Sequence, residues 1–383
     1  MHRRRVMSTM GSLGLLYGLL ASNSACAADS AHRQNLNPDP WSNFKTNFVS
    51  EDGRVIDLGS ERRQTYSEGQ GYALFFALVA NDRITFAKLL QWTEANLCKG
   101  DMTACLPAWL WGRKDDQTWG VLDDNSASDA DLWIAYSLGE AGRLWSLQRY
   151  KLLSEFLIAR ILKEETARIP SLGLSLLPAP KGFVVEGKTW RLNPSYMPMH
   201  LMHWLSVYQS DAQWREIEQS SLKIIVSASP MGYVPDWILY DEKNQFSIDK
   251  NGIEKGQGAY NAIRTYLWAG FLDRNYEHKS TLTKKLSAMA IFVKNHGYPP
   301  ESIDVLSGKF SNPGSTGFSA ALLPFLASLG DEKTLKAQQQ RIEVYPPRQD
   351  EYYPQVLKMF GEGWLYGLYK FNKNGQLLTR WKN

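Results

Sequence analysis

Apolar residues recur three and four positions apart along most of the chain, which is the spacing of one face of an α-helix. The segments with this pattern are 71–97, with a break near 81–82, and then 129–145, 150–162, 200–208, 214–226, 259–272, 281–295, 318–329 and 353–371. Segments rich in Pro, Gly, Asn and Asp separate them and favour loops. Short strands are expected only beside 182–183 and at 245–248.

The helical segments follow one another as pairs, about every 25–35 residues, without a strict sequence repeat. No low-complexity linker interrupts residues 40–383. Roughly a dozen helices in one uninterrupted stretch favour a single helical toroid over the two domains that length alone would suggest. We therefore predict an all-α fold with one domain over residues 28–383.

The first residues have the order of a secretory signal peptide. A basic start with Arg3, Arg4 and Arg5 precedes a short apolar segment, 11–21, and Ala25-Cys26-Ala27 offers small residues for cleavage. This pattern favours a signal peptide over residues 1–27 rather than a cytoplasmic protein with an apolar first helix. No later segment has the roughly 18 apolar residues of a membrane span. We expect a periplasmic or secreted protein without membrane insertion.

The net charge of the chain argues against two classes of binding partner. Cleavage after Ala27 removes three arginines and no acidic residue, so the formal net charge falls from +4 to +1. A chain this close to neutral has no electrostatic reason to bind nucleic acid or an anionic membrane surface. The 14 Trp and 18 Tyr suit a large core, and they also allow stacking on sugar rings.

Cys98 and Cys105 lie close together in sequence. In an oxidising compartment they could form a disulfide or remain two thiols, because spacing alone does not give their geometry. The histidines do not pair with acidic residues at metal-ligand spacing, and no Gly-rich phosphate loop is present. We predict neither a metal nor a cofactor.

Two acidic segments carry candidate chemistry. In TYSEGQGY, Glu68 lies at a predicted helix start between small residues; it is either a functional acid or a first-turn residue that complements the helix dipole. In ASDADLWIAY, Asp129 and Asp131 straddle another helix start just before an apolar run. A buried carboxylate there needs partners or a function, although helix capping by Ser128 or Asp129 remains the alternative.

Both segments resemble glycoside hydrolase family 8. The string ASDADLWIAYSLGEAGRLW, residues 127–145, fits the signature of that family, and SEGQGYALFFALVANDR is similar to its acid-bearing segment. PAWLWG, WRLNPSYMP, VPDW, AIRTYLWAG, NHGYPPE and GFSAALLPFL resemble segments of the periplasmic endo-β-1,4-glucanases of bacterial cellulose-synthesis operons. The resemblance spans about residues 40–372 and implies an (α/α)6 barrel with a substrate groove across one end.

The resemblance also implies roles for single residues. Glu68 matches the general acid of the family, and Asp129 matches a carboxylate of the central sugar site. Such enzymes cut β-1,4-glucan internally with inversion, one carboxyl protonating the leaving oxygen while another activates water. Segments that supply sugar-binding aromatic residues contain Trp109, Trp111, Trp133, Trp190 and Tyr196, although about half of these are expected in the core.

The chain departs from the family pattern at the base. The usual aspartate of a Tyr-Asp-Ala-x-Arg segment is replaced in Tyr260-Asn261-Ala262-Ile263-Arg264. An amide cannot accept a proton from water at neutral pH. We expect Tyr260 and Arg264 to orient the side chain at 261, and Asp129 to be the substitute base, with Glu254 and Asp236 as alternatives.

The sequence thus predicts a cellulase-type endo-1,4-β-glucanase whose partner is a β-1,4-glucan chain. The cellulose synthase and export complex is a further candidate partner. Two alternatives remain because of Asn261: a weakly active or inactive glucan-binding protein of the export machinery, and a glycanase for another β-1,4 polymer such as chitosan or xylan.

Overall fold

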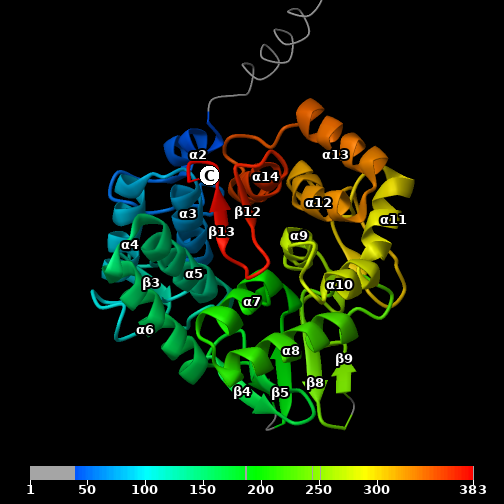
Figure 1. Cartoon of the computed structure of the whole chain (residues 1–383), viewed down its shortest axis with the longest axis horizontal. Helices are drawn as coiled ribbons and strands as arrows, with labels where there is room; N and C mark the ends of the chain where they lie inside the picture. Colours follow the sequence, from blue (N-terminus) through cyan, green and yellow to red (C-terminus); the bar gives the residue numbers. More distant parts are fainter. Residues whose placement is uncertain (1–38, 186–187, 244, 251, 383) are drawn as a thin grey trace, which may run out of the picture.

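The computed structural model describes residues 39–382, apart from 186–187, 244 and 251. The predicted signal peptide, residues 1–27, lies outside the described residues. No helix in the described part of the chain is long and apolar enough to cross a membrane. Figure 1 shows the helices arranged as a ring, seen along the shortest axis of the molecule.

An inner ring of helices forms the centre of the fold. These are α3 (Ser67–Val79), α5 (Ser128–Trp145), α7 (Met199–Tyr208), α9 (Ala262–Phe271), α12 (Thr316–Leu329) and α14 (Tyr352–Leu365). Each contacts the next around the ring. The ring closes between α14 and α3, where the Phe360 and Phe76 rings lie 4.6 Å apart. These helices are apolar on nearly all sides because they are covered on nearly all sides.

An outer helix follows each inner one along the chain. The outer helices are α4 (Arg83–Leu97), α6 (Gln148–Glu164), α8 (Ala212–Ser227), α10 (Lys279–Lys285) with α11 (Ser287–His296), α13 (Glu332–Val344) and, before α3, α2 (Pro40–Phe48). They bury one face only, as their mixed apolar and polar positions require. Six inner and six outer positions among the described residues make an (α/α)6 barrel, which confirms the predicted fold.

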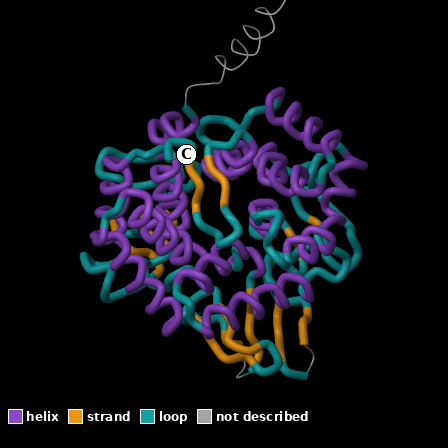
Figure 2. The backbone as a smooth tube through the Cα atoms, viewed as in Figure 1, coloured by secondary structure: helices purple, strands orange, loops and turns teal. Residues whose placement is uncertain are grey.

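Small antiparallel sheets occupy the connections. One contains β1 (Thr65–Tyr66), β2 (Leu110–Arg113) and β3 (Trp119–Asp123); another contains β6 (Val184–Val185), β7 (Thr189–Leu192), β8 (Ile238–Asp241) and β9 (Gln245–Ser247). The two-stranded sheets are β4 (Thr166–Ile169) with β5 (Gly173–Leu176), β10 (Gln257–Gly258) with β11 (Ile303–Asp304), and β12 (Tyr369–Phe371) with β13 (Leu377–Thr379). Figure 2 shows several of these strands at the lower edge of the view, outside the ring of helices.

The two ends of the barrel differ. The β12–β13 hairpin fills one end, where Phe371 packs 4.5 Å from the His200 ring and the Gly375 carbonyl accepts the Tyr136 hydroxyl at 2.8 Å. Figure 1 shows this hairpin at the centre of the ring. The inner helices begin at the other end, so the first turns of α3, α5 and α9 and the short helix η1 (Pro194–Tyr196) bring their side chains together there.

The structure differs from the predicted helices in three places, and it contains short strands in connections where the sequence predicted none. The segment 281–295 is divided at Leu286 into α10 and α11. The segment 353–371 is helical only to Leu365, because Gly367 adopts φ +71° and turns the chain into β12. Helices α2 and α13 were not predicted, since α2 is short and α13 is mostly polar.

Candidate active site

Glu68 lies in the first turn of α3, directly after the short strand β1. Its Oε2 is buried and finds no hydrogen-bond partner in the described structure. Burial, and to a smaller extent the neighbouring Asp129, raises the pKa of Glu68 to about 8, although Arg264 opposes this shift. A carboxyl with these surroundings keeps its proton at neutral pH and can donate it.

Asp129 begins α5 and is 2% exposed. Its Oδ1 accepts the Ala130 N–H at 2.9 Å, and its Oδ2 lies 3.2 Å from Nη1 of Arg264. Burial raises the pKa of Asp129, and the guanidinium opposes that shift. The helix is capped by Ala127 without a side-chain bond, so the alternative that Ser128 or Asp129 caps α5 is wrong.

Arg264 of α9 connects the residues at this end of the barrel. Its Nη2 donates to Oδ1 of Asn261 at 2.7 Å and to the Ser195 hydroxyl at 3.1 Å, and its Nη1 donates to the Tyr72 hydroxyl at 3.2 Å. Arg264 is 6% exposed, and its guanidinium also forms an ion pair with Asp129. Arg264 therefore fixes Asn261 and Asp129 relative to each other, as predicted for Asn261.

The two alternative bases have other partners. Glu254 accepts Nη2 of Arg191 at 2.9 Å. Asp236 accepts the N–H groups of Ala259 and Ala262 at 2.8 and 2.7 Å through one oxygen, which satisfies free donors at the start of α9. Burial raises the pKa of Asp236, but its carboxylate is held by the backbone. Both acids thus have partners of their own, away from the ion pair of Asp129 with Arg264.

Three of the predicted aromatic residues remain partly exposed. Trp109 stacks on Tyr66 with ring centroids 6.1 Å apart, next to the strand that leads to Glu68. Trp111 follows on β2 and stacks on Trp119 of β3, with ring centroids 5.4 Å apart. The Arg264 guanidinium lies 5.7 Å from the Tyr196 ring centroid, which places Tyr196 beside the acids.

Three other predictions are wrong. Trp133 is fully buried at the centre of the barrel, 5.0 Å from the Phe75 ring, so it cannot stack on a sugar. Trp190 is 8% exposed and packs against Tyr240, so it belongs to the core of the β6–β9 sheet. Tyr260 donates its hydroxyl to Glu301 at 2.9 Å, so the prediction that it orients Asn261 is wrong. Because 53% of its surface is exposed, contact of Tyr260 with the substrate stays a prediction.

Sequence reasoning missed Trp237 and Ser195. Trp237 lies between the Arg191 guanidinium, 4.0 Å from its ring centroid, and Phe183, which is stacked at 5.5 Å. Its neighbour Asp236 in VPDW could have drawn attention to it. Ser195 lies in NPSYMP, but no local signal shows that its hydroxyl meets Arg264.

The cysteines are free thiols in this structure, so the disulfide alternative does not describe it. The Cys98 thiol donates to the Cys105 carbonyl at 3.4 Å. Within the described ranges, no group of three His, Cys, Asp or Glu side chains is arranged to hold a metal ion.

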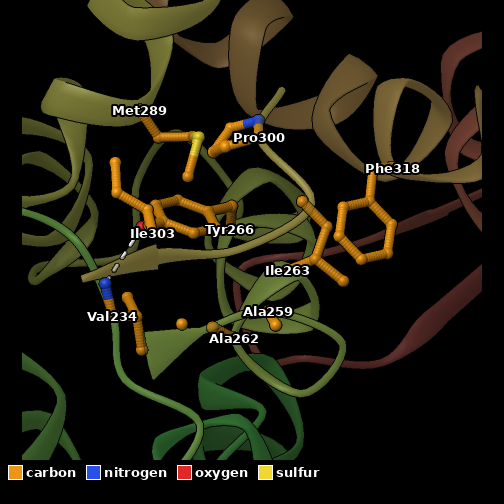
Figure 3. Close-up of a pocket in the computed structure, with 10 residues that line it drawn as sticks. Val234, Ala259, Ala262, Ile263, Tyr266, Met289, Pro300, Ile303 and Phe318 are labelled. Atoms are coloured by element: carbon orange, nitrogen blue, oxygen red, sulfur yellow. Dashed lines mark hydrogen bonds between the residues drawn. The ribbon is translucent and has the colours of Figure 1, made fainter. Parts of the chain in front are cut away.

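A small apolar cavity lies beside the segment that carries Asn261 (Figure 3). Ala262, Ile263, Met289 and Phe318 line it, and the Tyr266 hydroxyl accepts the Val234 N–H at 3.0 Å. This cavity contains none of the acids, so the chemistry belongs to the first turns of α3 and α5 instead.

Comparisons with known proteins agree on one family. The model described as "Glycosyl hydrolases family 8" matches residues 8–367. The endoglucanase of Salmonella typhi is 45% identical over 343 residues, which cover 89% of this chain and 90% of that protein. The endoglucanase of Xanthomonas axonopodis pv. citri (strain 306) is 41% identical over 386 residues, and the aligned region covers 100% of this chain and 98% of that protein.

A solved structure gives the same relationship. The endo-1,4-D-glucanase from Vibrio fischeri ES114 has a TM-score of 0.83 and 45% sequence identity. The superposition covers 90% of this chain and 99% of the other.

Proposed function

The chain belongs to glycosyl hydrolases family 8, and from that membership we propose that it hydrolyses internal β-1,4 linkages of a glucan with inversion. The observation that carries this proposal is the pairing of Glu68, whose Oε2 is buried without a hydrogen-bond partner, with Asp129, which faces a guanidinium. Such a pair can divide the roles of acid and base, because burial raises the pKa of both carboxyls while the ion pair with Arg264 opposes that rise at Asp129.

Glu68 is the general acid of this proposal. With a pKa of about 8 it is protonated at neutral pH and can give its proton to the leaving glycosidic oxygen. Trp109 and Tyr196 would contact the glucan chain, because their rings remain partly exposed near this end of the barrel. Trp111 lies between Trp119 and the Arg54 guanidinium, and Trp237 lies between Phe183 and the Arg191 guanidinium, so only the edges of these two rings could meet a sugar. An aromatic ring offers the apolar face of a sugar a surface for packing.

Asp129 is the proposed base. Asn261 can hold a water but cannot take its proton, and its Oδ1 is already bound by Arg264. Asp236 and Glu254 are less suited, since Asp129, and neither of these two, is among the groups that act on the pKa of Glu68. Asp129 has an ion pair that favours its charged form and lies close enough to Glu68 for their charges to interact.

A second candidate function follows from Asn261. A chain that lacks the usual base could bind a β-1,4-glucan without cutting it, because aromatic side chains bind sugars independently of catalysis. Such a protein would serve the cellulose export machinery as a binding component. The unpartnered Glu68 favours hydrolysis, since burying a carboxyl without a partner is costly and gives a binding protein no benefit.

One set of assays separates these functions. Reducing-end release and viscosity loss are measured with carboxymethylcellulose, xylan and chitosan, and binding of cello-oligosaccharides is measured by calorimetry. We expect rapid loss of viscosity with carboxymethylcellulose alone. Asp129→Asn should abolish cutting, whereas Asp236→Asn and Glu254→Gln should retain it. Binding without cutting by the native protein would favour the second function.

The biological setting is also a proposal. We propose that residues 1–27 direct export, that residues 28–383 form one catalytic domain, and that the protein acts in the periplasm during cellulose production. The support is the basic and apolar start of the chain and the resemblance of its segments to endoglucanases of cellulose operons. Amino-terminal sequencing of the exported protein tests the cleavage after Ala27.

A further inference from the structure

Two carboxyls lie behind the acid site and take no part in the proposed mechanism. Asp131 is in the first turn of α5, and Glu165 follows the last residue of α6. Both are 0% exposed. Buried carboxyls are expected to have hydrogen-bond partners, so their surroundings need an explanation.

Hydrogen-bond donors are scarce around these two groups. Oε1 of Glu165 accepts the Ser126 hydroxyl at 2.5 Å, but Oε2 of Glu165 and both oxygens of Asp131 find no donor in the described structure. The side chains of these two buried residues interact with each other: burial and then Glu165 raise the pKa of Asp131, whereas burial raises the pKa of Glu165 and the contact with Asp131 opposes that rise. Two ionised carboxylates so placed would repel each other, so the pair holds at least one proton, and Asp131 is the carboxyl that keeps it.

The contacts of Glu165 enclose the segment that carries Asp129. Ser126 lies before Asp129 in the sequence and Asp131 lies after it, and both side chains meet the same carboxyl. The backbone of Glu165 is itself fixed, because its N–H donates to Ile161 at 2.9 Å and its carbonyl accepts the Leu177 N–H at 2.7 Å. The carboxyl of Glu165 therefore anchors the start of α5 to the end of α6.

Mostly acidic groups surround the pair. The titratable and charged residues that interact with it or with its acidic neighbours are Tyr66 of β1, Glu68 and Tyr72 of α3, Cys98 after α4, Asp129 of α5, Glu164 of α6, Tyr196 of η1, Arg264 of α9, and Tyr352 and Tyr353 of α14. Arg264 is already paired with Asp129. A negative charge on the pair thus lies near Asp129 and Glu68, and it makes the loss of a proton from either of these two carboxyls less favourable.

We propose that Asp131 and Glu165 are a positioning pair that shares one proton, holds Asp129 in place and, through its single negative charge, helps Glu68 to keep its proton. The effect on Glu68 rests on the proposed function, whereas the shared proton does not. Neither residue contacts the reacting atoms in this proposal.

The shared proton is tested without any catalysis. Infrared spectra of the Glu68→Gln protein at neutral pH are compared with those of Glu68→Gln combined with Glu165→Gln or with Asp131→Asn. We expect each added amide to remove one protonated-carboxyl band, because the remaining carboxylate accepts a hydrogen bond from the amide. Glu164→Gln, at the adjacent position, is the control and should remove none. Unchanged bands in both pair variants would show two ionised carboxylates and overturn the proposal.

The effect on Glu68 is tested with the pH profile of kcat/KM for cello-oligosaccharides. Each single amide keeps one negative charge and one hydrogen bond, so the alkaline limb should stay in place. The double variant Asp131→Asn/Glu165→Gln loses the charge, and its alkaline limb should move to lower pH by about one unit. An unmoved limb in the double variant, or an equal shift in the single variants, would contradict the role in positioning and charge.

The two proposals fail in different ways. If the native protein does not cut glucan, the hydrolytic function fails while the infrared comparison still decides the shared proton. If the native protein cuts and the infrared bands do not change, only the positioning pair is wrong. Circular dichroism of every variant identifies any that fails to fold, and the single amide variants then carry the test.

Discussion

At position 264 one guanidinium contacts four neighbours, and this explains how an amide fits at position 261. Arg264 binds Asn261 and the hydroxyls of Tyr72 and Ser195, and it pairs with Asp129. An aspartate at 261 would compete with Asp129 for the same positive charge. With Asn261 the whole charge is available to Asp129, which favours the ionised form that a base needs.

The first residue-scale prediction concerns Arg264→Lys. Lysine keeps the charge but cannot direct hydrogen bonds to several partners in a plane, so Asp129 and Asn261 lose their relative position. We expect kcat/KM to fall about 100-fold. Arg341→Lys is the matched control, because Arg341 also holds several acceptors but lies on α13. Equal losses in both variants would contradict a specific role for Arg264.

Glu68 gives a prediction about activity and pH. The acid must be protonated, and its pKa is raised to about 8 by burial and by Asp129. We expect kcat/KM to fall as pH rises through about 8. Tyr66→Phe, which leaves the carboxyl in place beside the strand, should keep that limb. A profile that falls instead near pH 5 would contradict the burial of Glu68.

The same residue gives a prediction about stability. Between its ordinary value of 4.5 and about 8, the folded protein holds a proton that the unfolded chain releases. The free energy of unfolding therefore decreases with rising pH in this window. Glu68→Gln should remove that dependence. The free energy of unfolding of the variant minus that of the native protein should therefore be larger at pH 7 than at pH 4 by roughly 2–4 kcal/mol. Thermal unfolding of both proteins across this pH range is the measurement, and parallel curves would contradict the account.

At the scale of elements, the site is built from helix beginnings. The first turns of α3 and α5 carry Glu68 and Asp129, and α9 begins beside Asn261. Free N–H groups at a helix start need acceptors, and Asp236 supplies one carboxylate oxygen to two of them. The carboxylate that resembled an alternative base is thus part of the support of α9.

Asp236 therefore gives a prediction at this scale. Asp236→Ala leaves two N–H groups without an acceptor and should destabilise the protein by about 1–2 kcal/mol. Asp236→Asn keeps an acceptor oxygen and should retain most of the stability and activity. If Asp236→Asn folds normally but loses activity 100-fold or more, Asp236 is the base and the assignment to Asp129 is wrong.

The sequence predicted these elements better than their contacts. Apolar periodicity located the inner helices, and the acidic segments located Glu68 and Asp129 at their first turns. Strands as short as β1 have no alternation to detect, so the hairpins were missed. Trp133 appeared suited to sugar binding because its segment resembles one that supplies sugar-binding aromatic residues in the family, yet α5 is buried on nearly every face. Glu165 carries no local signal, since its partners are distant in the chain.

At the scale of the molecule, close contacts between inner helices hold the first turns in register. A Cβ at Gly361 of α14 would lie 1.8 Å from the Ala320 carbonyl oxygen of α12. Two inner helices therefore pack backbone to backbone, which a larger side chain would prevent. A shift of α12 and α14 would propagate around a closed ring to α3 and α9.

This packing predicts that Gly361→Ala destabilises the protein by about 2–3 kcal/mol, although alanine is the better helix former. Gly363→Ala on the same helix is the control, because its Cβ would meet only a ring atom of Tyr369, at 3.0 Å. Urea unfolding of the two variants measures the difference. A stabilising effect of Gly361→Ala would show that α12 and α14 do not pack so closely.

The most direct test of the account compares the native protein, Glu68→Gln and Asn261→Asp in one assay of reducing-end release from cello-oligosaccharides. The account predicts that the native protein cuts, that Glu68→Gln loses at least 100-fold of the activity, and that Asn261→Asp stays within about tenfold of native. An inactive native protein that begins to cut only with Asn261→Asp would contradict the assignment of Asp129 as base and identify a fold retained for binding.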